Sequence, residues 1–153
     1  MKELDILLKD LKLTSFSNHY AEIAEICEKN QSSMIDFLFE LVQLEFNKRH
    51  DNRIKRLIKN SKIPRDKHLN DFDFKRIPDL SMSVIKRLSA GDFIDKAENI
   101  LIFGNPGTGK THLAIALTRE WCLSGRKVKF YQAYELVHAL FARESEAKAN
   151  SPG

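Results

Sequence analysis

Long apolar runs, paired cysteines and glycines are all scarce in this chain of 153 residues. No apolar stretch approaches the ~20 residues that a membrane-spanning helix needs. The start, MKELDILLKD, mixes charges with leucines, so it lacks the uninterrupted apolar region of a signal peptide. Cys27 and Cys122 are far apart and neither belongs to a C-x-x-C pair. We therefore expect a cytoplasmic protein with buried free thiols and no membrane association.

Arrangements typical of catalytic triads or metal centres are also missing. The five histidines (19, 50, 68, 112 and 138) show no metal-ligand spacing. No Ser/His/Asp or Cys/His arrangement can be argued, so no residue is assigned a catalytic role. His112 follows a candidate metal-binding threonine, but on a helix its side chain should point away from the phosphates, which favours a packing or polar role.

Three of the six glycines fall within one octet, GNPGTGKT, at residues 104–111. It matches the phosphate-binding loop G-x-x-x-x-G-K-[ST] and lies between an apolar run at 99–103 and a helical stretch at 111–123. Glycines let the backbone approach a polyphosphate closely, while successive N–H groups and the helix N-terminus form an anion cradle. This context argues against a chance glycine-rich turn. The predicted phosphate-binding residues are Gly104, Asn105, Pro106, Gly107, Thr108, Gly109, Lys110 and Thr111, with Lys110 directed to the β/γ-phosphates and the Thr111 hydroxyl to Mg²⁺.

The first third of the chain is predicted to be helical. Apolar residues recur at helical spacing over 4–11, 20–27 and 37–58, and Ser33 with Asp36 forms a capping-box-like start for the third helix. Pro64 bounds that helix, because the residue before a proline is pushed out of the α region.

The remainder alternates between connectors, strands and helices. We expect an irregular connector at 69–80, a short helix at 82–88, a second strand at 128–133 and a helix at 134–142. The predicted fold class is an incomplete α/β P-loop NTPase domain (69–142), preceded by an all-α N-terminal module (1–68) and followed by a polar, disordered tail (143–153).

One segment carries the entire positive excess. The window 48–67 holds nine lysines and arginines against two acidic residues, whereas the whole chain has a net charge of only +4. Such a basic helix indicates phosphate contacts on DNA, a solvated surface that keeps the protein soluble, or an acidic surface on a partner protein. The candidate DNA-binding residues are Arg49, Arg53, Lys55, Arg56 and Lys59.

Several stretches taken together resemble a known family. They are LKLTSFSNHYAEI, IKRLIKNSKIP, LNDFDF, GDFIDKAENILIFGNPGTGKTHLAIAL and SGRKVKFYQAYELVHAL, which cover residues 10 to about 142. In this order they resemble the IstB-like transposition helper ATPases, AAA+ proteins related to the DnaC-type helicase loaders.

The resemblance implies binding of ATP and Mg²⁺, assembly on DNA and cooperation with the transposase of the same insertion element, together with full-length homologous subunits. It also implies that Phe72 or Phe74 lies against the adenine. The alternative for both rings is a core-anchoring role in the connector.

The sequence departs from the family pattern after the second strand. A third strand ending in two acidic residues (Walker B), a sensor residue and an arginine finger do not follow, so we expect nucleotide binding without efficient turnover by this polypeptide alone. The two predicted strands are not neighbours in the family's sheet. The ATPase half should therefore lack ladder partners, as in a fragment of a longer protein.

Two other functions remain open. A DnaC-like helicase loader would bind a hexameric helicase through its N-terminal module. A non-enzymatic module would bind DNA or transposase with its helices alone and carry a vestigial loop. A small-molecule kinase is disfavoured because no lid or acceptor site is recognisable.

Overall fold

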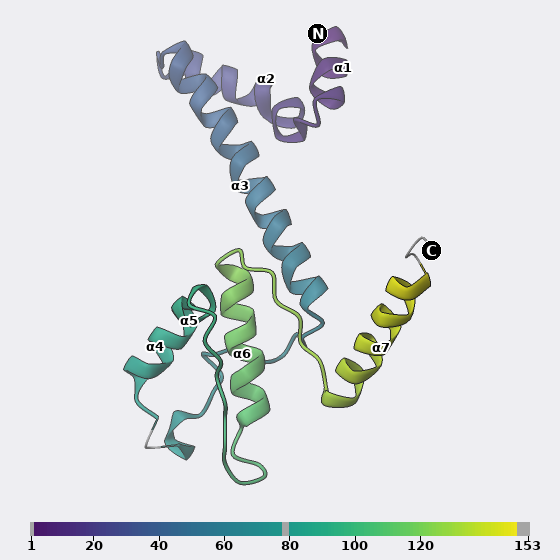
Figure 1. Cartoon of the computed structure of the whole chain (residues 1–153). Helices are drawn as coiled ribbons and strands as arrows, with labels where there is room; N and C mark the ends of the chain where they lie inside the picture. Colours follow the sequence, from purple (N-terminus) through teal and green to yellow (C-terminus); the bar gives the residue numbers. More distant parts are fainter. Residues whose placement is uncertain (1, 78–79, 150–153) are drawn as a thin grey trace. The chain divides into compact units, whose positions relative to one another are not determined.

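The computed structural model describes residues 2–77 and 80–149 of the chain (Figure 1). The chain divides into two compact units, Met1–Lys55 and Arg56–Gly153. The division falls inside the helix α3 (Met34–Ser61), whereas the sequence predicts a boundary at residue 68. None of the described helices is long and apolar enough to cross a membrane.

The N-terminal unit is built from α1 (Lys2–Asp10), α2 (Thr14–Lys29) and the first part of α3. Its core consists of buried Ile23, Cys27 and Leu41, against which Phe16, Tyr20 and Phe37 pack. The helical spacing of these side chains on α2 and α3 brings them to one face of each helix. The prediction of three helices in this part of the chain is confirmed.

A reciprocal capping box fixes the start of α3. The Ser33 hydroxyl accepts a hydrogen bond of 3.1 Å from the Asp36 amide. The Asp36 carboxylate in turn accepts hydrogen bonds from the Ser33 amide (3.0 Å) and the Ser33 hydroxyl (2.7 Å). These bonds satisfy amides that have no partner inside the helix, and they stabilise its first turn. The hydrogen bonds from the Ser33 side chain and amide lower the pKa of Asp36.

The second unit has a separate core that surrounds α6 (Lys110–Leu123). Phe72 and Ile85 pack against Leu113 and Leu117 of α6, and all four are buried. Ile85 belongs to α4 (Met82–Ala90), which is followed by the single turn α5 (Asp92–Asp95); a 3₁₀ turn, η1 (Phe74–Arg76), precedes α4. Trp121 of α6 packs against this core and donates a hydrogen bond of 2.8 Å to the Leu88 carbonyl.

The strands expected at 99–103 and 128–133 are not formed. Both segments are drawn as plain loops in Figure 1, and the described residues contain helices, turns and irregular segments but no strand. A strand needs a neighbouring strand to pair its N–H and C=O groups, and these two segments do not pair with each other. Leu101 and Phe103 consequently remain 76% and 86% exposed. The α/β arrangement is thus not seen in the described residues, and the phosphate loop follows an extended but unpaired segment.

The last helix is longer than predicted. α7 spans Ala133–Ala149, whereas the sequence predicts a helix to 142 and a disordered tail over 143–153. Alanine, glutamate and lysine dominate its last turns, and all three are strong helix formers. Residues 150–153 of the predicted tail lie outside the described residues.

Candidate nucleotide-binding site

The loop 104–109 leads directly into α6 and carries three glycines with positive φ. These angles are 156° at Gly104, 81° at Gly107 and 91° at Gly109. Residues with a Cβ rarely adopt such angles, so the glycines are required by the backbone path. The loop is exposed at residues 104–107, and it lies at the lower end of α6 in Figure 1.

Lys110 is the first residue of α6 and folds back over the loop. Its ammonium group donates hydrogen bonds to the carbonyl oxygens of Gly104 (2.8 Å) and Asn105 (2.7 Å). The Asn105 carbonyl also accepts a hydrogen bond of 2.9 Å from the Thr108 hydroxyl. The lysine and the loop therefore hold each other in place, and a polyphosphate would compete with two carbonyls for the same ammonium group.

The N-terminus of α6 is left open to a ligand. Its N-cap is Gly109, which has no side chain to accept a hydrogen bond from the first turn. The first N–H groups of a helix have no intrahelical partner, and they favour an anion. Thr111 is exposed on this first turn, where a hydroxyl ligand to Mg²⁺ is needed. A Cβ on Gly107 would meet no atom within 4 Å, so the space beside this glycine is open. The arrangement fits a polyphosphate with its metal ion.

The two phenylalanines of the connector lie in the core of the second unit. Phe72 is 7% exposed and Phe74 packs against its ring edge-on, with centroids 4.9 Å apart. A cavity of about 390 Å³ beside the loop is lined by Gly104, Thr108 and Lys110 and by apolar residues including 100–103, but by neither phenylalanine. Both rings thus serve as core anchors, and an adenine contact by either one stays a prediction.

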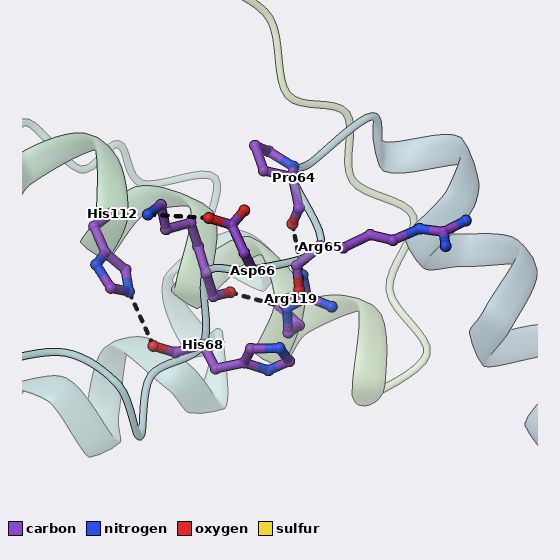
Figure 2. A network of polar contacts seen from close by, with 7 residues as sticks. Pro64, Arg65, Asp66, His68, His112 and Arg119 are labelled. Atoms are coloured by element: carbon purple, nitrogen blue, oxygen red, sulfur yellow. Dashed lines mark hydrogen bonds and ion pairs between the residues drawn. The ribbon is translucent and has the colours of Figure 1, made fainter.

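A buried arginine, which the sequence patterns do not single out, fastens the segment after α3 to α6. Arg119 is 7% exposed and donates hydrogen bonds to the carbonyl oxygens of Pro64 (2.6 Å), Arg65 (3.0 Å) and Lys67 (3.0 Å). Figure 2 shows the Pro64 carbonyl turned toward the guanidinium group. The signal that could have revealed it is a single arginine among the buried residues of α6, which are Leu113, 115–118 and Cys122, since a buried charge needs several polar partners.

His112 adds a second attachment one helical turn from the loop. Its Nε2–H donates a hydrogen bond of 3.1 Å to the His68 carbonyl (Figure 2). Its ring meets Phe72 edge-on, with centroids 5.4 Å apart. The predicted packing and polar role of this histidine is confirmed. The nearby Asp66 carboxylate has a lowered pKa because the Lys67 ammonium donates to it.

The described residues contain no cluster of three or more potential metal ligands from histidine, cysteine and carboxylate side chains. Cys27 and Cys122 are free and buried, as predicted. Burial raises the pKa of the Cys122 thiol, which makes it a poor nucleophile.

The five candidate DNA-binding residues all lie on α3 and are exposed. Arg49 is engaged locally, because its guanidinium donates hydrogen bonds to Glu45 (2.6 Å) and to the Lys12 carbonyl (3.0 Å). The other four are Arg53, Lys55, Arg56 and Lys59. Ile54 and Leu57 are buried between them, so the basic side chains extend from the solvent-facing sides of the helix.

Comparison with known proteins agrees with the loop geometry. Residues 6–152 match the family described as IstB-like ATP binding protein. The chain is 34% identical over 146 residues to "Insertion sequence IS21 putative ATP-binding protein" of Pseudomonas aeruginosa, covering 95% of this chain and 55% of that protein. It is 37% identical over 138 residues to "Insertion sequence IS5376 putative ATP-binding protein" of Geobacillus stearothermophilus, covering 90% of this chain and 55% of that protein.

The chain thus spans about half the length of the curated relatives that it matches. The match runs through both units and includes the phosphate loop, and it confirms the resemblance drawn from the sequence. This protein belongs to the family of IstB-like ATP-binding proteins.

Proposed function

We propose that this chain is an ATP-binding helper for insertion-sequence DNA transposition, which binds ATP with Mg²⁺ and assembles on DNA with a transposase. The observation that carries the ATP part is the loop 104–109, with Lys110 folded over it and an uncapped helix N-terminus behind it. The names of the relatives, which assign them to insertion sequences, support the transposition part.

Each part of the loop has a distinct task in this proposal. The loop amides and the first turn of α6 bind the phosphate oxygens, while the Lys110 ammonium neutralises their charge. The Thr111 hydroxyl holds the Mg²⁺ that accompanies ATP and screens its phosphate charges. These residues bind and orient the nucleotide.

DNA binding is assigned to the basic side chains of α3. Lys55, Arg56 and Lys59 are exposed, and Ile54 and Leu57 keep the opposite side of the helix buried. Lysine and arginine contacts to phosphates give affinity that depends strongly on salt and weakly on sequence. We expect this behaviour of the protein on DNA.

The ATP part is tested by equilibrium binding of a fluorescent, slowly hydrolysed ATP analogue in the presence of Mg²⁺. The wild-type protein should bind with micromolar affinity, and Lys110→Ala should weaken binding by at least about tenfold, because one charge-assisted phosphate contact is worth about 1.5–3 kcal/mol. Lys129→Ala, which removes an exposed lysine of the same unit, is the control and should bind as the wild type does. Equal binding by wild type and Lys110→Ala would contradict the proposed site.

A second candidate is a binding module whose N-terminal helices act alone. It is favoured by the separate core of the N-terminal unit, Ile23, Cys27 and Leu41. DNA binding measured with and without ATP separates the two. If ATP drives assembly, Lys110→Ala loses the ATP-dependent gain in DNA affinity; if the helices act alone, ATP and the substitution leave DNA affinity unchanged.

A further inference from the structure

The aromatic ring of Phe72 occupies the space beside Gly109 that a side chain would fill. A Cβ on Gly109 would lie 3.0 Å from Cε2 and 3.4 Å from Cζ of Phe72. The other two loop glycines differ. A Cβ on Gly107 would meet nothing within 4 Å, and one on Gly104 would meet only Thr108 and Lys110 of the loop itself. The connector therefore touches the loop backbone at its last glycine, where φ is 91° and α6 begins.

Phe72 is itself held firmly in this position. It is 7% exposed, and the rings of Phe74 and His112 meet it edge-on at 4.9 Å and 5.4 Å. Its amide donates a hydrogen bond of 3.2 Å to the Leu69 carbonyl. The preceding backbone is fastened to α6 through His112 and Arg119. The ring is thus fixed to the helix whose N-terminus it supports.

We propose that Phe72 is a positioning residue for the phosphate loop and acts through Gly109 rather than through the adenine. By filling the space beside Gly109, the ring holds the positive-φ backbone in place. The amides at the start of α6 then point at one ligand position before the nucleotide arrives. Preorganised amides bind more tightly because less ordering is needed on binding. This inference rests on the proposed binding of ATP by the same loop.

The distinction between a loop support and a base contact is testable with a ligand that has no base. Inorganic tripolyphosphate presents the phosphates alone, whereas ATP presents phosphates and adenine. If Phe72 supports the loop, Phe72→Leu should weaken the binding of ATP and the binding of tripolyphosphate by the same factor. We expect a loss of affinity of about two- to twelvefold, since an aromatic contact is worth about 0.5–1.5 kcal/mol.

The measurement is isothermal titration calorimetry of the full chain with each ligand in Mg²⁺, accompanied by thermal unfolding of every variant. Phe93→Leu is the matched control, because Phe93 is half-buried and also meets an aromatic residue of α6 edge-on, with its ring centroid 5.3 Å from that of Trp121. It should leave both affinities unchanged. His112→Ala removes the ring that flanks Phe72 from a half-buried position, so it tests the support even if Phe72→Leu does not fold. His112→Ala should also weaken the binding of both ligands by the same factor.

Three results would overturn the inference. A weaker affinity for ATP with an unchanged affinity for tripolyphosphate would mean that the ring contacts the base. Unchanged affinity for both ligands in Phe72→Leu, or in His112→Ala where the former does not fold, would mean that the loop needs no support. Failure of the wild-type protein to bind either ligand would instead refute the proposed nucleotide site, and this inference would fall with it.

Discussion

Arg49 and Glu45 form an ion pair with 2.6 Å between Nε and Oε1, and the glutamate of this pair is buried. The other carboxylate oxygen accepts a hydrogen bond of 2.9 Å from the amide of Ser15, in the first turn of α2. Glu45 therefore satisfies an amide at the start of α2, which has no side-chain cap of its own. Arg49, a candidate DNA contact, is at the same time a structural residue of the N-terminal unit.

Replacing Glu45 should destabilise the N-terminal unit. Glu45→Gln keeps the shape of the side chain but removes the charge that Arg49 pairs with. We expect the free energy of unfolding to fall by about 1–2 kcal/mol, because a charge-assisted hydrogen bond in a buried position is lost. Urea denaturation followed by circular dichroism measures this change. Glu40→Gln, an exposed position on the same helix, serves as the control and should leave stability within about 0.5 kcal/mol of the wild type.

The same pair predicts how stability depends on pH. Burial raises the pKa of Glu45, but the hydrogen bonds from Arg49 and from the Ser15 amide outweigh it, and the net pKa lies below the usual 4.5. A carboxylate with a lowered folded pKa stabilises the fold above its unfolded pKa, and this stabilisation is lost as the pH falls through the folded pKa. The urea midpoint should therefore be steady above about pH 5 and fall below it. Glu45→Gln should show a smaller fall; an identical fall in both proteins would assign it to other carboxylates, such as Asp36.

The basic side of α3 should contribute to DNA affinity without contributing to folding. A triple Lys55→Ala, Arg56→Ala, Lys59→Ala variant should weaken DNA binding. It should also reduce the slope of log K against log salt by about 2–3, because each phosphate contact contributes about 0.9. Fluorescence anisotropy across a salt series measures both quantities. A charge-matched variant with Lys86, Arg87 and Lys127 replaced by alanine should retain the wild-type slope, since these exposed residues lie outside the basic window. Equal slopes in the two variants would mean that the basic window makes no specific contribution.

Arg119 should matter more to stability than Arg126, which is also paired in this unit. Arg119→Met removes a buried guanidinium group together with its hydrogen bonds to three carbonyls, so we expect a loss of about 2–4 kcal/mol. Arg126 donates two hydrogen bonds of 2.7 Å to Asp95, but the Asp95 side chain is 65% exposed. Arg126→Met should therefore destabilise the protein less than Arg119→Met does, because solvent screens an exposed ion pair. Chemical denaturation of the two variants compares them, and an equal loss would contradict this ranking.

Local sequence signals predicted the local structure well. The reciprocal bonds between Ser33 and Asp36 join residues only three apart, so the motif specifies the start of α3 without help from distant residues. The phosphate loop is similar, because its glycines and Lys110 bond within the octet itself.

Long-range partners explain what the sequence did not reveal. Arg119 bonds to carbonyls 52 to 55 residues earlier, and no pattern of residue types encodes a backbone acceptor at that distance. The apolar run at 99–103 has the composition of a strand, but composition cannot supply the neighbouring strand that would pair with it. The contact between the Phe72 ring and Gly109 likewise joins residues that are 37 positions apart in the sequence.

The hydrogen bonds between residues 64–67 and Arg119 determine where the chain can be shortened without loss of stability. The boundary predicted from the sequence would give a polypeptide that starts at residue 69. This polypeptide would keep the phosphate loop and α6 but lose all three carbonyls that accept hydrogen bonds from the Arg119 guanidinium group. It would also lose the His68 carbonyl that holds His112. The arginine would then be left as a solitary charge in an apolar setting, and the truncated half would be prone to unfold or aggregate during purification. Recombinant preparation of the nucleotide-binding half should therefore retain residues 64–68, which follow α3.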